Sequence, residues 1–259
     1  MEDTRRPIIV TWDFTDKSEF SFQHAKMLSD FLNTRIYLLH IVKKDSEIND
    51  ATTKLNEVAT SFGSKYGCTP AILVKTGNIF KTISETAKNI NAILIIMALH
   101  SSRRAHKVVH GSSTPYMLVQ TPPKHNKISD IIMPVDTAKE NRVQINWAVL
   151  LSKYFECNIN IIKPFINSDY KNDLMKKNIY FVRQHFDNKD VVYGIRTAKR
   201  KVKFNDAIKD FAVEIEADMI FIMSYEFKSF MKGAEKADLK TPVLCINPRT
   251  DLTILPDKR

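Results

Sequence analysis

Hydrophobic residues along the chain alternate between short continuous runs and positions at helical spacing. In the first half, apolar runs near residues 7–12, 35–42, 71–76, 92–98 and 115–120 predict β-strands. The first, second and fourth runs are almost wholly apolar, which is typical of strands buried on both faces of a parallel sheet. The intervening segments predict amphipathic helices through three sets of positions: Ala25, Leu28, Phe31 and Leu32; Leu55, Val58 and Phe62; and Ile83, Ala87 and Ile90.

The second half repeats this pattern in the same order. Residues 8–13 align with 131–136 at an offset of 123, and residues 36–39 align with 159–162 at the same offset. Further along, Ile83 aligns with Ile208 at 125, residues 94–97 with 220–223 at 126, and Thr114-Pro115 with Thr241-Pro242 at 127. A small drift with unchanged order is what loop insertions produce, so the pattern indicates a duplication.

Alternating strands and helices predict an open, doubly wound α/β sheet in each half. We therefore expect two tandem five-stranded parallel-sheet domains of the Rossmann-like or flavodoxin-like type. The polar, proline-containing stretch 121–127 predicts a linker, which divides the chain into domains 1–124 and 125–259, with a tail from about residue 249. Gly77 and Gly194 are each expected to follow a third strand, at a tight turn that needs glycine.

Several segments carry a family resemblance through their order, which occurs twice. The opening strands end in Asp13 within "IIVTWDF" and in Asp136 within "IIMPVD", and later segments read "IYLLHIV", "ADMIFIMS" and "TPVLCI". Over residues 7–248 the chain resembles the universal stress protein family, as a tandem pair. The resemblance implies a five-stranded parallel α/β fold and a stress-linked binding or regulatory role. Because relatives usually dimerise, a tandem chain resembles a dimer made within one molecule.

Relatives that bind ATP carry G-x2-G-x9-G-[ST] after the fourth strand, where backbone N–H groups meet the phosphates. In the first half, the first two glycine positions hold Ala98 and Ser101. Gly111-Ser112 has the right spacing, but too few residues follow it before Pro115 for a helix, so we expect Gly111 to end a helix over about 102–110. In the second half, Ser224 and Phe227 replace the glycines. We expect no ATP binding and no cofactor, and keep a nucleotide-binding or slowly ATP-hydrolysing module with an atypical phosphate site as the alternative.

Asp13 and Asp136 are expected at the carboxyl end of each first strand, at the mouth of the sheet's binding crevice. The resemblance implies a role for them in holding adenosine, whereas the interpretation that we favour is a cap on the following turn or helix.

A dense basic cluster forms a second candidate site, in which Arg200 and Lys201 are positioned to hold an anion, unless the segment is a flexible charged loop. Gly194 to Ile208 spans 14 positions and Gly77 to Ile83 spans 6, which predicts an insertion here. The cluster comprises Arg196, Lys199, Arg200, Lys201 and Lys203.

The sequence contains few further signs of catalysis or of metal binding. No nucleophile elbow or P-loop motif is present, so we expect a protein that is not an enzyme. His106 and His110 share a helical face near His100, but further ligands are not evident, which favours a solvated face over a zinc site. Three scattered cysteines, Cys68, Cys157 and Cys245, favour inert thiols in a reducing compartment. Since no signal core or membrane-length apolar run is present either, we expect a cytoplasmic protein.

Partner predictions follow from charge and from the last strands. The formal net charge is +10, but the lysines are mixed with acids, which favours a solvated surface over a nucleic-acid or membrane partner. The last strands of the two halves, 115–120 and 242–247, are apolar, and an uncovered apolar edge invites pairing. We therefore expect the two copies to pack together as a pseudo-dimer, with room for a protein partner that the sequence does not identify.

Overall fold

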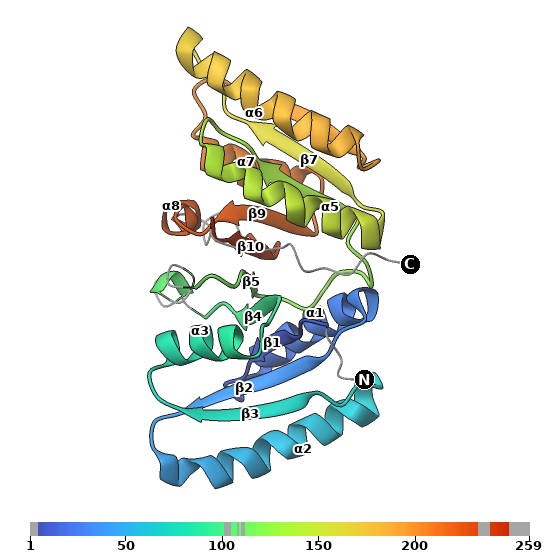
Figure 1. Ribbon diagram of the computed structural model, residues 1–259, viewed down its shortest axis with the longest axis vertical. Coiled ribbons are helices and arrows are strands. Elements are labelled where there is room, and N and C mark those ends of the chain that lie inside the picture. The colour runs from blue at the N-terminus through green and yellow to red at the C-terminus, as the bar shows by residue number, and fades with distance from the viewer. Residues whose placement is uncertain (1–4, 101–104, 108, 110–111, 233–238, 249–259) are drawn as a thin grey trace. The chain divides into compact units, whose positions relative to one another are not determined.

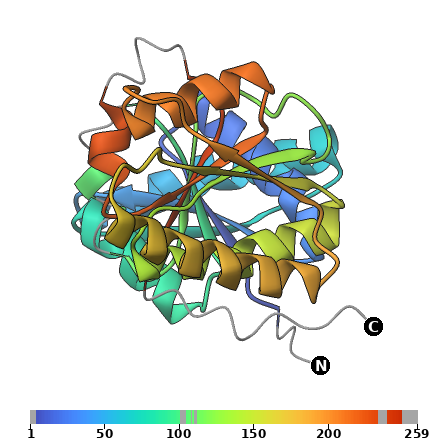
Figure 2. The same cartoon turned by 90° about the horizontal axis from the view of Figure 1, so that it is seen from above.

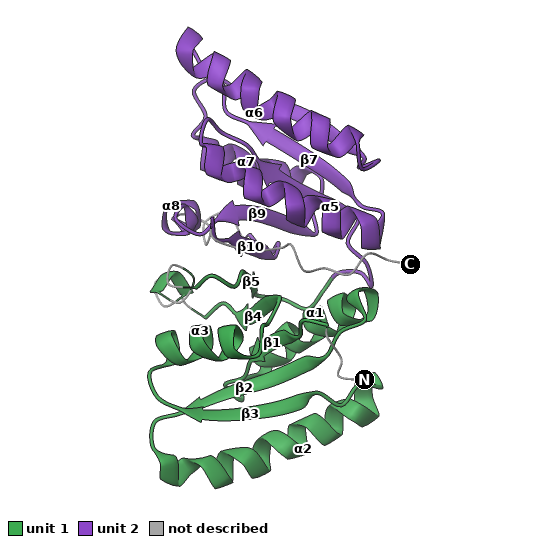
Figure 3. Ribbon diagram, in the orientation of Figure 1, with its two compact units in different colours: residues 1–123, 253–259 green, residues 124–252 purple. Residues whose placement is uncertain are grey.

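The chain divides into two compact units in the computed structural model, which describes residues 5–100, 105–107, 109, 112–232 and 239–248. Unit 1 comprises residues 1–123 and 253–259, and unit 2 comprises residues 124–252 (Figure 3). Each unit is an α/β domain with a parallel sheet, as the sequence predicts (Figure 1). The expected tail from residue 249 lies outside the described residues.

Unit 1 has its strands in the order β3-β2-β1-β4-β5. Helix α1 packs against β1 and β4, and α2 packs against β2 and β3. The order reverses between β1 and β4, which is where doubly wound sheets open a crevice at the carboxyl ends of their strands. The elements are β1 Ile8–Thr11, α1 Asp16–Leu32, β2 Ile36–Val42, α2 Ile48–Tyr66, β3 Ala71–Thr76, α3 Ile79–Asn89, β4 Leu94–Ala98 and β5 Tyr116–Val119.

Unit 2 repeats the topology, with strands in the order β8-β7-β6-β9-β10. Figure 2 shows α5 and α6 on one side of its strands and α7 on the other. The elements are β6 Asp130–Pro134, α5 Val143–Phe155, β7 Asn158–Lys163, α6 Asp169–Asp187, β8 Tyr193–Thr197, α7 Phe204–Glu214, β9 Met219–Met223, α8 Phe227–Met231 and β10 Val243–Ile246. A short 3-10 helix, Lys139–Arg142, leads into α5.

Apolar burial explains why these segments form strands. Ile8, Ile9 and Val10 of β1 are completely buried, as are Ile131 and Ile132 of β6. Helices cover both faces of the central strands, so each side chain of these strands is removed from water whichever face it occupies. The first strands of the two units also pair in equivalent register with the second strands, because Ile8 lies opposite Ile36 and Ile131 opposite Ile159.

The sequence alignment of the fourth strands is wrong by one residue. Ile8 lies opposite Leu94, whereas Ile131 lies opposite Met219, so Leu94 corresponds to Met219 and the offset is 125 rather than 126. Pairing with the last strands agrees, since Ile95 lies opposite Tyr116 and Ile220 opposite Val243. Both segments are uniformly apolar, so a shift of one residue leaves their patterns equally matched.

The two glycines expected after the third strands have different roles. Gly77 follows β3 with a φ of 141°, and a Cβ at this position would lie 2.7 Å from the Thr82 hydroxyl, so this turn needs glycine. Gly194 instead lies inside β8, one residue after the strand begins, and the prediction that it follows the strand is wrong. Ala198 follows β8, and its N–H donates to the Lys163 carbonyl at 2.8 Å.

Candidate functional site

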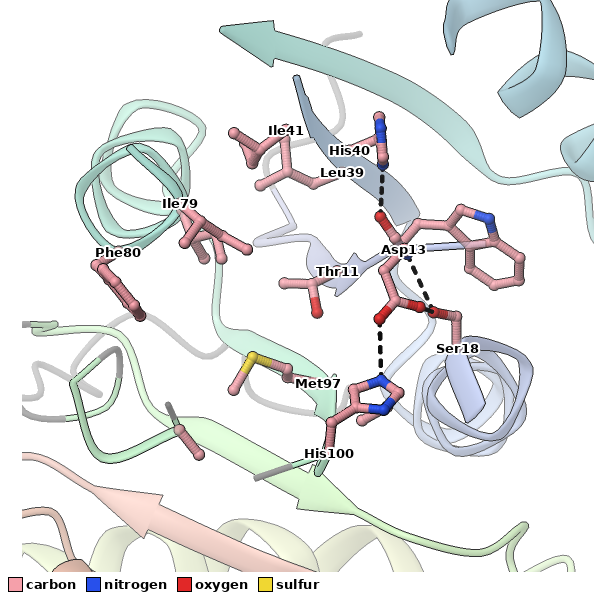
Figure 4. A pocket seen from close by; sticks show the side chains of 14 residues that line it. Thr11, Asp13, Ser18, Leu39, His40, Ile41, Ile79, Phe80, Met97 and His100 are labelled. Atoms are coloured by element: carbon pink, nitrogen blue, oxygen red, sulfur yellow. Dashed lines mark hydrogen bonds and ion pairs between the residues drawn. The ribbon is translucent and has the colours of Figure 1, made fainter. Parts of the chain in front are cut away.

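A cavity of about 400 Å³ opens in unit 1 at the carboxyl ends of β1, β2 and β4 (Figure 4). Its position is the point where the strand order reverses, at which side chains from separate strands converge. Thr11 ends β1, and its hydroxyl points into the cavity. Most of the wall is apolar, and it is formed by Leu39, Ile41, Ile79, Phe80, Ile83, Met97, Ala98 and Ala105.

Asp13 lies at the mouth of this cavity and holds the turn into α1. Its Oδ1 atom accepts hydrogen bonds from the Thr15 N–H at 3.1 Å, the Thr15 hydroxyl at 2.7 Å and the Ser18 hydroxyl at 2.5 Å. The Asp13 N–H in turn donates to the Ser18 hydroxyl at 3.1 Å. This geometry gives Asp13 the local turn-stabilising role that we favoured from the sequence, while a role toward adenosine stays a prediction.

The second oxygen of Asp13 faces a histidine. His100 Nε2 lies 2.9 Å from Asp13 Oδ2, and both side chains remain partly exposed (Figure 4). Partial burial pushes the pKa of Asp13 upward, but the hydrogen bonds from Ser18 and Thr15 and the charge of His100 outweigh it and lower the pKa. Asp13 is therefore an ionised carboxylate at neutral pH, with both oxygens already engaged.

A second histidine borders the cavity. His40 Nδ1 lies 2.7 Å from the Trp12 carbonyl, which means that Nδ1 carries the proton and donates it. The Phe14 ring packs edge-on against the His40 ring, with 4.8 Å between the ring centres. The backbone of Phe14 has a φ of 61°, in the left-handed region. The cavity is thus lined by a carboxylate, two imidazoles and two hydroxyls in addition to its apolar wall.

The segment after β4 is described only in part. Ser101, Gly111 and His110 lie outside the described residues, while residues 105–107 and 109 are helical, within the helix expected over 102–110. Ser112 begins no helix: its hydroxyl accepts from the Thr114 N–H at 3.1 Å, and Pro115 follows immediately. The described part of this segment is Leu99, His100, residues 105–107 and 109, and residues 112–114, and it contains no glycine.

Asp136 holds the equivalent turn in unit 2 with different partners. Its Oδ1 atom accepts from the Ala138 N–H at 2.7 Å and from the Asn141 side-chain amide. Asn141 is 5% exposed and accepts from the Gln144 amide at 3.0 Å, and Asn178 donates to the Asp136 carbonyl at 2.9 Å. Asp136 therefore sits on a buried amide network, whereas Asp13 is held by hydroxyls.

The turn after β9 brings acidic and phenolic groups near Asp136. By the strand register, Tyr225 occupies the position of His100, and Glu226 follows it. Burial raises the pKa of Glu226 to about 7, and the charge of Asp136 adds to the effect. Burial and then the charges of Glu226, Asp136 and Glu140 raise the pKa of Tyr225. In unit 2 a phenol thus takes the position of His100, and the acid that lies near Asp136 is Glu226, at the position of Ser101.

The corrected register also moves the positions expected for the phosphate loop of unit 2. The counterparts of Ala98 and Ser101 are Met223 and Glu226, not Ser224 and Phe227. Phe227 instead begins α8, and its side chain is completely buried, as is that of Phe230. Residues 224–232 contain no glycine, so the sequence-based conclusion about the loop is unchanged although its residues are corrected.

Four residues of the basic cluster, Lys199, Arg200, Lys201 and Lys203, are exposed in the loop between β8 and α7, whereas Arg196 lies in β8. This loop, residues 198–203, has six residues, whereas the loop between β3 and α3 has only Gly77 and Asn78. The strand register aligns Ile72 with Ile195 at an offset of 123, and Ile83 aligns with Ile208 at 125, so the insertion is two residues and not eight. The remaining difference in loop length arises because β8 ends two positions earlier than β3. An anion site at Arg200 and Lys201 stays a prediction.

Sequence reasoning assigned none of His40, His100 and Glu226 to these sites, although it named His100 beside the histidines weighed as zinc ligands. His100 and Glu226 each lie a few residues beyond a fourth strand, and alignment of the strand ends would have placed them beside Asp13 and Asp136. Among the described residues, no three His, Cys, Asp or Glu side chains form a group suited to a metal ion. None of the helices described is long and apolar enough to cross a membrane.

Solved structures with this fold cover almost the whole chain. A universal stress protein from Archaeoglobus fulgidus DSM 4304 matches with a TM-score of 0.74 and 15% identity, over 94% of this chain and 96% of that chain. A functionally unknown protein from Pseudomonas aeruginosa PAO1 matches with a TM-score of 0.65 and 14% identity, over 95% of this chain and 94% of that chain. At such identities the likeness shows a shared fold. No protein-family model and no curated protein matches the sequence.

Proposed function

We propose that the protein is a tandem universal stress protein that acts by binding rather than catalysis, with the unit 1 crevice as its ligand site. The observation that carries this proposal is the cavity of about 400 Å³ at the carboxyl ends of β1, β2 and β4. Its volume falls within the range of small-molecule sites, and its position is where open α/β sheets bind ligands. The solved structures of similar fold support the family as the framework.

The lining of the cavity favours a ligand with an apolar or planar body and one polar group. Met97, Ile83 and Phe80 provide apolar contact, and the Thr11 hydroxyl is directed into the cavity. Asp13 offers little to a ligand unless His100 moves, because its two oxygens are engaged. The proposal is therefore a compact ligand recognised mainly by burial of its apolar surface.

We propose further that neither unit binds ATP specifically. Phosphate binding at this edge requires backbone N–H groups at close approach, which glycine permits. In unit 2, the chain at the end of β9 has no such glycines, and the corresponding segment contains Met223, Glu226 and the buried ring of Phe227. Binding of a nucleotide through its adenosine part alone is the alternative function, and it is favoured by the position of Asp13 beside the cavity.

Mass spectrometry of small molecules released from the denatured, purified protein tests the ligand site. We expect a compact ligand to be released from the wild type and to be lost in Ala98→Leu, which fills the cavity. Ser224→Leu adds the same bulk after the fourth strand of unit 2 and should retain the ligand. Equal amounts of ligand from both variants would place its site outside the unit 1 crevice.

Calorimetry distinguishes the two proposed binding modes. Titration with ATP and magnesium should give no dissociation constant below about 10 μM, which corresponds to roughly −7 kcal/mol. Titration with adenosine then decides the alternative, because tight binding of adenosine that Ala98→Leu abolishes would make the protein a nucleoside-binding module. The cytoplasmic location and the packing of the two copies through residues 115–120 and 242–247 stay predictions.

A further inference from the structure

The longer loop of unit 2, between β8 and α7, forms a defined basic surface. Four of its side chains, those of Lys199, Arg200, Lys201 and Lys203, are exposed, and we call residues 199–203 the basic loop. Its backbone is closed by the Val202 N–H, which donates to the Lys199 carbonyl at 3.3 Å, and Lys201 has a left-handed φ of 69°. The four cations are therefore held close together by a turn.

These cations have no acidic partner within the described part of the chain. Neighbouring Arg196 is different, since its guanidinium lies 2.9 Å from the Glu214 carboxylate. Four like charges within five residues repel one another, and an anionic partner would relieve that repulsion. Unit 1 has no counterpart of this surface, because only Gly77 and Asn78 connect β3 to α3.

Apolar side chains are exposed among the cations. Phe165, which follows β7 in the chain, is 47% exposed, and Val202 in the basic loop is 40% exposed. The guanidinium carbon of Arg200 lies 5.9 Å from the centre of the Phe165 ring, so the two loops touch. A partner that binds here can therefore bury apolar surface as well as neutralise charge.

The outer edge of β8 leads directly into the basic loop. In unit 2, β8 is the last strand of the sheet and pairs with β7. The Val192 carbonyl and the Ala198 N–H bond to β7, so strand alternation turns the backbone groups of Tyr193, Ile195 and Thr197 toward the unpaired edge. Such an edge is a template for another extended chain.

We propose that the outer edge of β8 and the basic loop together form a docking surface for an extended acidic segment of a partner protein, which adds to the sheet as a further strand. A polypeptide satisfies all three features at once, because its backbone pairs with β8, its carboxylates meet the basic loop and its apolar side chains cover Phe165 and Val202. A nucleic acid matches the charge but has no backbone groups with the spacing of a strand edge.

Fluorescence anisotropy with a labelled twelve-residue peptide of alternating valine and glutamate tests the proposal. The peptide should bind the full chain, and the affinity should fall as salt is raised. The variant Lys199→Glu/Arg200→Glu/Lys201→Glu/Lys203→Glu should weaken binding by at least about tenfold, or about 1.4 kcal/mol. The control reverses four other exposed lysines without a described ion pair and should bind as the wild type; these are Lys17, Lys88, Lys171 and Lys177.

Ile195→Pro tests strand addition separately from charge. Proline at this position removes an N–H on the outer edge and leaves the β7 ladder intact, so peptide binding should weaken while the melting temperature stays close to the wild type. If this variant does not fold, hydrogen exchange in the wild type serves instead, with slowed exchange expected at the amides of residues 193–197 when the peptide is added.

Three results would overturn the proposal. One is the absence of peptide binding, and another is equal binding by the charge-reversal variant and its control. The third is tighter binding of a twelve-nucleotide thymidine oligomer than of the peptide, which would mark the basic loop as a nucleic-acid surface.

Discussion

The two units share one fold but differ in the titratable groups that surround the aspartate after the first strand. In unit 1, Asp13 lies 2.9 Å from His100, and its pKa is lowered. In unit 2, Asp136 has Glu226 as a neighbour, and the pKa of Glu226 is raised to about 7. Both units keep the aspartate that holds the first turn. The position of His100 holds Tyr225 in unit 2, and the residue after it, Glu226, is an acid.

The comparison shows which part of such a site is structural. Both aspartates accept a hydrogen bond from the N–H two residues later and from the side chain five residues later, Ser18 or Asn141. Those bonds fix the entry to the first helix in both units. In unit 1 the second carboxylate oxygen faces His100, and Tyr225 holds that position in unit 2 while the turn is kept, so the turn does not require a histidine there.

The largest expected difference between the units comes from His24 in α1. This side chain is 3% exposed, and its Nε2 lies 3.1 Å from the Thr121 carbonyl. Burial lowers the pKa of His24 from 6.5 to about 4, against the raising effect of this hydrogen bond. As the pH falls from 6.5 to 4, His24 becomes protonated in the unfolded chain but stays largely neutral in the folded chain. The free energy of unfolding of unit 1 should therefore fall by about 3 kcal/mol.

Hydrogen exchange on peptides from each unit, measured at pH 6.5 and pH 4, checks this difference. His24→Phe should lack the corresponding pH dependence in unit 1. The equivalent residue in unit 2 is Trp147, which does not titrate, and provides an internal control. A wild-type and a His24→Phe protein with the same pH dependence would show that His24 is protonated without cost.

The next largest effect is expected where the two turns differ in burial. Asn141→Ala removes a buried donor to Asp136 and an acceptor of the Gln144 amide, and should cost about 2 kcal/mol. Ser18→Ala should cost about 1 kcal/mol, because Asp13 keeps its Thr15 hydrogen bonds and is partly exposed to water. Denaturant unfolding of both variants measures the two losses in the free energy of unfolding. A larger loss for Ser18→Ala than for Asn141→Ala would contradict the prediction.

A smaller effect is expected from Glu226. Since its folded pKa of about 7 lies above the ordinary value of 4.5, folding is favoured below pH 4.5, and this stability is lost as the pH rises through 7. Glu226→Gln should therefore stabilise unit 2 by about 1 kcal/mol at pH 8, after allowance for partial exposure, and by little at pH 4. Thermal unfolding of the variant and the wild type at both pH values measures this difference. An unchanged or lower stability of Glu226→Gln at pH 8 would show that the charge of Glu226 does not destabilise unit 2.

The smallest effect is expected at the exposed pair of unit 1. His100→Gln removes a partly exposed ion pair, which contributes less than about 1 kcal/mol to stability. The same substitution frees Asp13 Oδ2 at the cavity mouth, so it should change ligand binding more than it changes the melting temperature. Calorimetry with the copurified ligand compares the two effects, and a large stability loss with unchanged binding would make the pair structural.

The sequence by itself determined the α/β class, the duplication and the equivalence of Asp13 and Asp136. These features depend on local periodicity and on runs such as Ile8–Val10, whose burial on both faces leaves a direct pattern in the chain. The missing glycines are likewise visible in the sequence, and the strand register changes only which residues stand in their place in unit 2. Loss of ATP binding stays a prediction.

Only the tertiary structure decided which side chains meet. Gly194 belongs to β8 because of its pairing with β7, which no local pattern reports. The approach of His100 to Asp13, separated by 87 positions, and of His24 to Thr121 depends on where distant strands end relative to one another. Long-range register decides which residue types meet, and burial and neighbouring charges then shift their pKa values, so the two sites differ although the sequence still shows the repeat.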